Sequence, residues 1–313
     1  MNVFSSCYTI LGPTATGKTR LAVALSARVN GEVVSADSRQ VYRGMNIGTG
    51  KDLSDYTIDG LPIPYHLIDM VEAGCEYNVF QYQQAATRAI REIQSRGKTV
   101  ILCGGSGLYI EALLKGYKLF PVPENYALRK RWQNIPDEEL AQELARFRPL
   151  HNKTDTETRE RLLRALEIEH YYETHGELQV TAAPVPSLIF GVRGQRDRIR
   201  ERITLRLKER LNNGMIDEVK QLLQQGVPSH QLIRYGLEYK FITLYLQGVL
   251  DYETLFKQLN TAIHQFSKRQ MTWFRKMERD GFEIHWIEES WSVEKQLQYI
   301  EQIRALSLQT NDI

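Results

Sequence analysis

The sequence predicts an α/β fold in which helices cover both faces of a parallel sheet, with a small all-helical domain inserted into the chain. Three observations support this prediction. A short apolar strand at residues 8–11 leads into a glycine-rich loop and then a helix. A continuous apolar stretch at residues 99–103 is typical of a strand that is buried on both faces of a parallel sheet. Between two regions in which strands and helices alternate, residues 115–185 are polar, helical and poor in β-branched residues.

The first strand, Tyr8–Leu11, is followed by the sequence G-x-x-x-x-G-K-T and by a helix that begins near Arg20. In such a loop the glycines let backbone N–H groups turn toward a phosphate, and the helix dipole favours the anion. The residues expected to bind a di- or triphosphate are Gly12, Pro13, Thr14, Ala15, Thr16, Gly17, Lys18 and Thr19. Lys18 is expected to reach the outer phosphate, and the Thr19 hydroxyl is expected to ligate Mg²⁺. The predicted core is therefore P-loop NTPase-like, with three layers.

The next elements of the N-terminal region alternate in the same way. Residues 32–35 form a second expected strand, and residues 77–96 have the apolar spacing of a helix that stops at Gly97. The strand at residues 99–103 leads through a second glycine-rich turn into a helix that begins at Leu108. In a sheet of this kind, ligands bind at the carboxyl ends of the strands, where the phosphate loop also lies.

The insertion divides the core into two segments. We expect the core to comprise residues 1–114 and 186–313, and the helical insertion to comprise residues 115–185. After the insertion, a strand at residues 188–192 precedes long helices that extend to about residue 273. A short strand at residues 282–287 and a last helix complete the chain.

The composition is that of a globular protein in a reducing compartment. The 313 residues carry a net charge of +2, and charged residues make up 25% of them. The three cysteines lie far apart without a C-x-x-C pair, which argues against a zinc site or a disulfide framework. No segment has the length and hydropathy of a membrane span, and the first residues lack the layout of a signal peptide. We expect a monomeric, cytoplasmic protein that does not bind a membrane.

The charge is unevenly distributed along the chain. Residues 191–212 contain eight Lys or Arg against three acids, and residues 268–279 contain five against one. Two basic regions of this kind are typical of a protein that binds a polyanion. The alternative is that both regions are solvated faces of helices, and this is the more common explanation for a single charged segment considered by itself.

Two strand ends carry residues of chemical interest. Asp37 follows the second strand, where a carboxylate can act as a base or metal ligand; alternatively, Asp37 and Ser38 cap a following helix. The third strand ends in Cys103, and Gly104–Gly107 contains three glycines, which indicates either the close approach of a ligand or a tight turn. Cys103 stands where P-loop kinases and ATPases usually carry an acid that positions Mg²⁺, so the sequence argues against NTP hydrolysis.

Two helical segments combine cations with apolar residues. From about residue 195, four arginines recur at every fourth position beside an apolar stripe: Arg198, Arg202, Arg206 and Arg210. Arginine favours bidentate phosphate contacts, so this stripe can serve both the loop-bound phosphate and an RNA backbone. The alternative is that these arginines pair with Glu201 and Glu209 of the same helix.

In residues 265–275, basic residues are interspersed with aromatic residues. This pattern suits stacking on unpaired nucleobases, although aromatic residues at helical spacing more often belong to the core.

Together, these motifs resemble those of the tRNA dimethylallyltransferases, also called tRNA isopentenyltransferases. The matching segments occur in the family's order and cover nearly the whole chain. They are Gly12–Thr19, Ser35–Lys51, Tyr65–Asp69, Gly104–Tyr109, Arg161–Glu167 and Lys268–Arg275. The most specific are D-S-x-Q-V-Y, which begins at Asp37, and K-R-Q-x-T-W-F-R, which begins at Lys268.

The resemblance implies transfer of a dimethylallyl group from dimethylallyl diphosphate to N6 of adenine-37, beside the anticodon of certain tRNAs, with release of diphosphate. The phosphate loop then holds a leaving group, so neither a Walker-B acid nor a hydrolytic water is needed. The resemblance further implies that Asp37 is the base and that Thr14 positions it or the amine. Lys18, Arg206 and Mg²⁺ bound to Thr19 are expected to stabilise the diphosphate.

The resemblance also implies which residues contact the anticodon stem-loop, from whose stack the adenine must be extruded. They are Asp37, Ser38, Arg39, Gln40, Ser106, Arg129, Glu160, Arg161, Leu162, Leu163, Arg164, Lys268 and Arg269, together with the loop at residues 234–239. The helical insertion is expected to close on the stem-loop.

Three positions depart from the family's pattern. Gly50 stands where alanine is common, Glu238 where an arginine or lysine is common, and His264 where an arginine is usual. None of them lies in the phosphate loop or at Asp37, so activity is expected, with altered affinity for tRNA.

Two other functions remain as hypotheses. The first is a P-loop kinase that acts on a nucleoside or small metabolite, which leaves the basic regions unexplained. The second is a non-catalytic RNA-binding protein with a vestigial phosphate loop.

Overall fold

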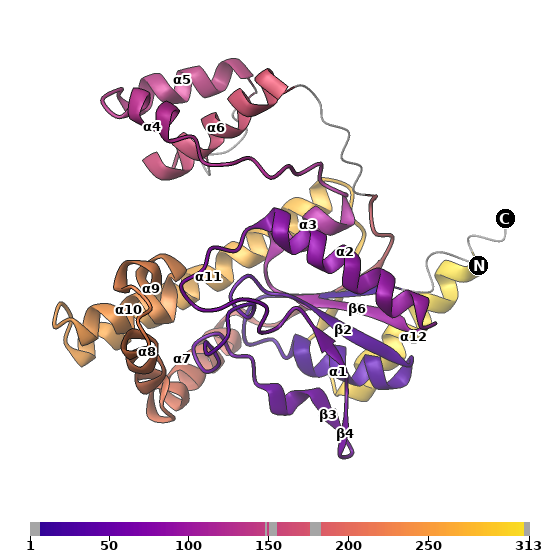
Figure 1. Cartoon of the computed structure of the whole chain (residues 1–313). Coiled ribbons are helices and arrows are strands. Elements are labelled where there is room, and N and C mark those ends of the chain that lie inside the picture. The colour runs from indigo at the N-terminus through magenta and orange to yellow at the C-terminus, as the bar shows by residue number, and fades with distance from the viewer. Residues whose placement is uncertain (1–6, 148, 150–154, 176–182, 310–313) are drawn as a thin grey trace. The chain divides into compact units, whose positions relative to one another are not determined.

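The computed structural model describes residues 7–147, 149, 155–175 and 183–309, which belong to two compact units (Figure 1). The first unit comprises Met1–Tyr117 and Ala183–Ile313, and the second comprises Lys118–Ala182. Each junction lies three residues from the boundary expected from the sequence.

The first unit contains a six-stranded sheet in the order β5-β2-β6-β1-β7-β8. Its strands are β1 (Cys7–Leu11), β2 (Gly31–Ala36), β5 (Tyr65–His66), β6 (Thr99–Gly104), β7 (Leu188–Arg193) and β8 (Ile284–Glu288). Every pairing in it is parallel. The predicted parallel sheet is therefore confirmed.

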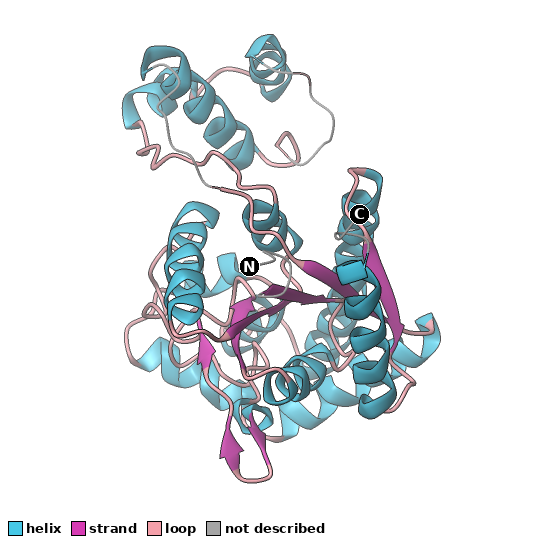
Figure 2. Cartoon of the chain, turned by 90° about the vertical axis from the view of Figure 1, so that its right-hand side faces the viewer, coloured by secondary structure: helices cyan, strands magenta, loops and turns pink. Residues whose placement is uncertain are grey.

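Helices cover both faces of this sheet (Figure 2). The helices α2 (Val79–Ser95) and α3 (Gly107–Leu114) pack on one face, with the C-terminal part of α11 (Tyr252–Arg279). The helices α1 (Lys18–Arg28) and α12 (Val293–Gln309) pack on the other. Successive residues of β1 alternate between the two apolar clusters, because neighbouring side chains of a strand point to opposite faces. The predicted three layers are thus present.

Local sequence explains where the elements next to the site begin and end. β1 passes into α1 through a loop whose last residue, Gly17, has φ 80°, a left-handed conformation that glycine adopts without steric cost. α2 begins at a capping box, in which Asn78 Oδ1 accepts the N–H of Gln81 and Gln81 Oε1 accepts the N–H of Asn78. Gly97, with φ 71°, follows the end of α2 as expected.

A second group of helices packs beside the sheet and holds the loop that follows β2. It consists of α7 (Arg196–Asn212), α8 (Met215–Gln224), α9 (Ser229–Tyr235), α10 (Leu237–Leu246) and the N-terminal part of α11. Val41 and Met45 of the loop are fully buried among these helices. The 3₁₀-helix Leu53–Tyr56 and the hairpin of β3 (Thr57–Ile58) and β4 (Leu61–Pro62) come next; the sequence analysis predicted neither, nor β5.

The second unit is helical in its described part, with α4 (Tyr126–Trp132), α5 (Asp137–Phe147) and α6 (Arg159–His175). A small apolar core joins them, formed by Trp132, Leu140, Leu144, Leu162, Ala165 and Leu166. In neither unit do the described residues include a helix with the length and apolar character needed to cross a membrane.

Candidate active site

Three loops meet at the carboxyl ends of β1, β2 and β6. The register places Leu11, Ala36 and Gly104 at the same level of the sheet, because Gly104 lies opposite both of the others. Ser106, just after β6, donates its N–H to Ala36 O at 3.1 Å. Its Oγ accepts the N–H of Ser38 at 2.9 Å. Two hydrogen bonds thus connect the segment that contains Asp37 with the loop that follows β6.

The phosphate loop is held in shape by its own polar groups. Thr16 Oγ1 donates to Pro13 O at 2.9 Å, and Lys18 Nζ donates to the same oxygen at 3.3 Å. Burial lowers the pKa of Lys18; the nearby Arg206 adds to this decrease, whereas the Asp37 carboxylate opposes it. Lys18 is therefore a half-buried cation near a second cation and one carboxylate, an arrangement that favours an additional anion.

Asp37 does not cap a helix, because residues 38–41 form turns and Tyr42 forms an isolated bridge with Val71. Its Oδ1 instead accepts the N–H of Arg39 at 2.9 Å. This local bond, typical of Asp in turns, holds one carboxylate oxygen in place. The helix-cap alternative from the sequence is wrong, and Asp37 lies half-buried at the strand edge that also carries the phosphate loop.

Arg39 is not a free surface cation. Its Nη1 donates to Glu238 Oε2 at 2.7 Å, and its guanidinium lies 5.3 Å from the centre of the Phe266 ring. Only 17% of the Arg39 side chain and 7% of the Glu238 side chain are exposed. The acid at position 238 is thus the ion-pair partner of Arg39, whose backbone N–H is bonded to Asp37.

The four arginines of α7 pair with acids from other segments of the chain. Arg202 and Arg198 approach the buried Glu289 at 2.6 and 3.5 Å. Arg206 and Arg210 both approach Asp52 Oδ2, at 2.5 and 3.3 Å. The alternative that these arginines pair with acids of their own helix is therefore wrong. Instead, Arg198 and Arg202 lie near the end of β8, and Arg206 and Arg210 lie near the phosphate loop.

His264 lies on α11, beside α7. Its Nε2 is 3.2 Å from Arg200 O and 3.3 Å from Thr204 Oγ1. Burial lowers the pKa of His264, which favours the neutral ring. The residue that stands in place of an arginine therefore serves as a contact between two helices.

Gln270 of the K-R-Q motif joins two of the loops. Its Oε1 accepts the N–H of Thr14 and its Nε2 donates to Gly105 O, both at 2.9 Å. A Cβ on Gly105 would lie 2.4 Å from Gln270 Nε2, and one on Gly107 would lie 2.3 Å from the indole of Trp273. The glycines after β6 therefore make room for side chains of α11. The sequence analysis had considered only the close approach of a ligand or a tight turn as reasons for these glycines.

Gln270→Leu is expected to weaken the binding of inorganic diphosphate by about tenfold, because the Thr14 N–H and Gly105 O lose their partner and the phosphate loop loses its support. Isothermal titration calorimetry measures this. Gln270→Glu retains an acceptor for Thr14 and should lose less affinity. The control is Gln265→Leu, an exposed position on the same helix, which should bind diphosphate like the parent. An unchanged affinity of Gln270→Leu would contradict the positioning role.

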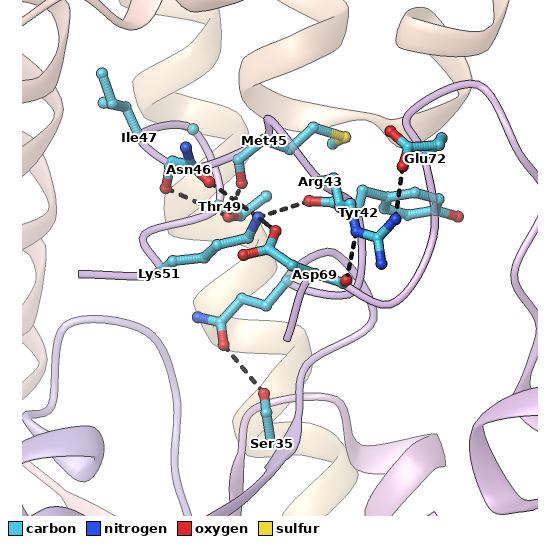
Figure 3. A network of polar contacts seen from close by, with 12 residues as sticks. Ser35, Tyr42, Arg43, Met45, Asn46, Ile47, Thr49, Lys51, Asp69 and Glu72 are labelled. Carbon is cyan, nitrogen blue, oxygen red and sulfur yellow. Dashed lines mark hydrogen bonds and ion pairs between the residues drawn. The ribbon is translucent and has the colours of Figure 1, made fainter. Parts of the chain in front are cut away.

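A buried lysine fixes the loop between β2 and β5 (Figure 3). Lys51 is 2% exposed, and its ammonium donates to Tyr42 O at 2.6 Å, to Asn46 Oδ1 at 3.0 Å and to Asp69 Oδ1. All three of its donors are thus used. Gln40, earlier in the same loop, donates its Nε2 to Gly50 O at 3.1 Å. The loop that starts at Asp37 is therefore fixed at several points.

In the second unit, Arg129 and Arg164 are both held by Glu167, at 2.7 and 3.1 Å. Burial alone would raise the pKa of Glu167, but its hydrogen bonds, chiefly from Arg129, hold that pKa below its usual range. Leu162 is 1% exposed in the apolar core, and Leu163 packs against the same core. The side chain of Leu162 is thus part of the apolar core, and its predicted contact with tRNA stays a prediction.

Four of the other expected RNA-binding residues are exposed. Lys268 and Arg269 are exposed on α11, and Glu160 and Arg161 are exposed on α6. Arg161 pairs with Glu157 of the same unit. The cations among them, Lys268, Arg269 and Arg161, are exposed to a polyanion in solution.

Thr19, the second residue of α1, is the metal ligand predicted from the sequence. Across residues 7–147, 149, 155–175 and 183–309, no three or more His, Cys, Asp or Glu side chains gather into a metal site. Mg²⁺ is commonly held by few protein ligands together with substrate phosphates. Thr19 at the start of α1 is in the position to be such a ligand, with diphosphate oxygens as the others.

The fold and this site define a P-loop protein of the α/β class whose phosphate loop, carboxylate and arginines gather at the carboxyl edge of the sheet. The chain belongs to the IPP transferase family, whose model matches residues 40–277. The family predicted from the motifs is thus confirmed. A tRNA dimethylallyltransferase 1 of Parabacteroides distasonis is 54% identical over 92% of this chain and 94% of the relative. One of Porphyromonas gingivalis is 57% identical over 90% of this chain and 93% of the relative.

Solved structures agree with this assignment. A tRNA isopentenylpyrophosphate transferase of Bacillus halodurans is 30% identical, with a TM-score of 0.71 over 98% of each chain. A eukaryotic dimethylallyltransferase acting on tRNA is 22% identical, with a TM-score of 0.72 over 91% of this chain and 74% of the other. The second similarity shows a shared fold only.

Proposed function

We propose that this protein transfers the dimethylallyl group of dimethylallyl diphosphate to N6 of adenine-37 in a subset of tRNAs, and releases diphosphate. The observation that supports this most directly is the pairing of a carboxylate with a phosphate loop. Asp37 directly follows β2, whose last residue Ala36 lies at the level of Leu11, the last residue before the phosphate loop, so a proton acceptor and a cation for the leaving group lie at the same edge of the sheet. Membership of the IPP transferase family supports the same reaction.

The proposed reaction needs one bond broken and one formed. The bond between the allylic carbon and the diphosphate oxygen breaks, the bond between that carbon and N6 forms, and Asp37 takes the N6 proton. Lys18 and Arg206 stabilise the negative charge that develops on the diphosphate. Mg²⁺ held by Thr19 would supply further positive charge to the same oxygens. Thr14 is placed by Gln270 at the edge of the loop, where it can orient Asp37 or the amine.

The tRNA anticodon stem-loop is the proposed partner. Lys268 and Arg269 on α11 offer exposed cations for its phosphates, and the helical unit offers Arg161. Ser38 and Ser106 lie at the strand edge where the extruded adenine must be held. We further propose that the protein acts as a monomer in the cytoplasm, to which its three free cysteines are suited.

A P-loop kinase is the alternative function. Such an enzyme needs an acid at a strand end to position Mg²⁺ and the attacking group. At the end of β6, the strand next to β1, burial raises the pKa of Cys103 to about 12, so this thiol is neutral and a poor magnesium ligand. The site therefore favours the transferase.

The test is incubation with labelled dimethylallyl diphosphate, Mg²⁺ and bulk tRNA, followed by mass spectrometry of the nucleosides. Dimethylallyl-adenosine is the expected product, and its absence would overturn the proposal. A thermal-shift comparison separates the kinase alternative: dimethylallyl diphosphate should raise the Tm of the transferase strongly, whereas a kinase should respond to ATP.

A further inference from the structure

Arg206 and Arg210, one helical turn apart on α7, share a single carboxylate oxygen. Asp52 Oδ2 lies 2.5 Å from Arg206 Nη2 and 3.3 Å from Arg210 Nη2. Both arginines line a pocket together with Thr14 and Ala15 of the phosphate loop. An acid from another segment thus offsets one of the two positive charges that face the phosphate site, and a net charge of +1 remains.

Gly50 makes this arrangement possible. A Cβ at this position would lie 2.1 Å from Arg210 Nη2 and 2.8 Å from Arg206 Nη2. The departure from the alanine common in the family therefore has a structural reason, which is room for a second guanidinium. Gly50 also has φ 65°, a conformation that glycine adopts readily. Because three hydrogen bonds hold the Lys51 ammonium, the neighbouring residues Gly50 and Asp52 are fixed in position as well.

The two guanidiniums need an anion, and Asp52 is a weak one. Only 16% of the Arg210 side chain is exposed, and burial, followed by the nearby Arg206, lowers the pKa of Arg210. Asp52 is 44% exposed, so water screens its attraction to both arginines. A diphosphate offers more charge and several acceptor oxygens to the same pair.

We propose that Arg210 is a second diphosphate-binding arginine and that Asp52 is an internal counter-ion which the diphosphate of the donor displaces. Before the donor binds, Asp52 keeps both guanidiniums oriented toward the pocket. When the reaction is complete, its carboxylate competes with the product diphosphate and promotes its release. That the diphosphate belongs to a dimethylallyl donor rests on the proposed function.

The first test is calorimetric titration of inorganic diphosphate in the presence of Mg²⁺ and without tRNA. Asp52→Asn should tighten the Kd by about threefold to tenfold, because the competing charge is gone. Arg210→Gln should weaken it by about tenfold. The control is Glu294→Gln, which removes one charge from an exposed ion pair with Arg28 and should leave the Kd unchanged.

The second test uses the contact between Gly50 and Arg210. Gly50→Ala should weaken diphosphate binding about as much as Arg210→Gln does, because the methyl group displaces the guanidinium. In the Arg210→Gln background, Gly50→Ala should weaken binding less than it does in the parent, because only the contact with Arg206 and the strain of an alanine at φ 65° remain. Fully additive effects of the two substitutions would overturn the role of Arg210. If Asp52→Asn bound diphosphate with an unchanged or larger Kd, the proposal that diphosphate displaces Asp52 from the two arginines would be overturned.

A third measurement separates this inference from the proposed function. With tRNA and dimethylallyl diphosphate, Asp52→Asn should be inhibited by added diphosphate at a concentration about threefold to tenfold below that for the parent protein, in line with its tighter Kd. If the parent protein binds diphosphate as described but modifies no tRNA, the proposed function fails while the anion site stands. If tRNA is modified and the Asp52 and Arg210 variants bind diphosphate like the parent, the anion site fails while the function stands.

Discussion

Asp37→Asn is expected to lower the rate constant of dimethylallyl transfer by about 10²–10⁴-fold, with little change in the affinity for tRNA. The asparagine keeps an Oδ1 atom that accepts the N–H of Arg39, so the turn after β2 retains its shape. The amide cannot take the N6 proton, and the chemical step therefore slows. Single-turnover kinetics at saturating donor measure the rate constant, and fluorescence anisotropy with a labelled anticodon stem-loop measures the affinity.

A matched control for this prediction is Asp59→Asn, in the turn between β3 and β4. Asp59 is exposed and has φ 50°, which asparagine also tolerates, so neither the rate nor the affinity should change. If Asp37→Asn retained the turnover of the parent, Asp37 would not be the base. If it lost tRNA affinity in proportion to rate, the residue would serve binding rather than proton transfer.

Lys51→Met is expected to destabilise the protein by about 2–4 kcal/mol, the largest loss of stability among the substitutions considered for this site. Methionine fills the space of the aliphatic chain but leaves Tyr42 O without its donor and the Asp69 carboxylate without its cation. Asp69 is 36% exposed, so water compensates part of the loss. The Tm should fall by about 4–16 °C, which differential scanning calorimetry measures.

Arg43→Met is the control for Lys51→Met, because it removes a cation from the same loop. Arg43 donates to Glu72 Oε1 and Asp69 O, but its side chain is 57% exposed, and exposed pairs contribute about 0–1 kcal/mol. An equal fall in Tm for the two variants would contradict the view that burial makes Lys51 the anchor of the loop.

Elements set by local sequence could be predicted. The apolar residues of β1, the glycines of the phosphate loop and the helix pattern of α1 are contiguous, and so are the apolar residues of β6. The two-residue strands β3, β4 and β5 are too short to show a period and were missed.

Contacts between distant segments could not be predicted in the same way. The arginine stripe of α7 was recognised, but its partners Glu289 and Asp52 lie in segments that only the tertiary fold brings near. Gln270 was part of a recognised motif, and the glycines after β6 were noticed, yet neither pattern indicates that the two fit together. The burial of Leu162 had a signal, since Leu162 and Leu166 are four residues apart on one helix face.

The bond between Gln270 and the phosphate loop has a consequence for synthesis of the protein. Gln270 follows Thr14 by 256 residues. At about 5–20 residues per second, a ribosome needs roughly 13–50 s to make the intervening chain. During that time β1, β2 and β6 are already available to pair, but the Thr14 N–H and Gly105 O lack their partner. A nascent chain can thus form the centre of its sheet well before its phosphate loop gains the support of Gln270.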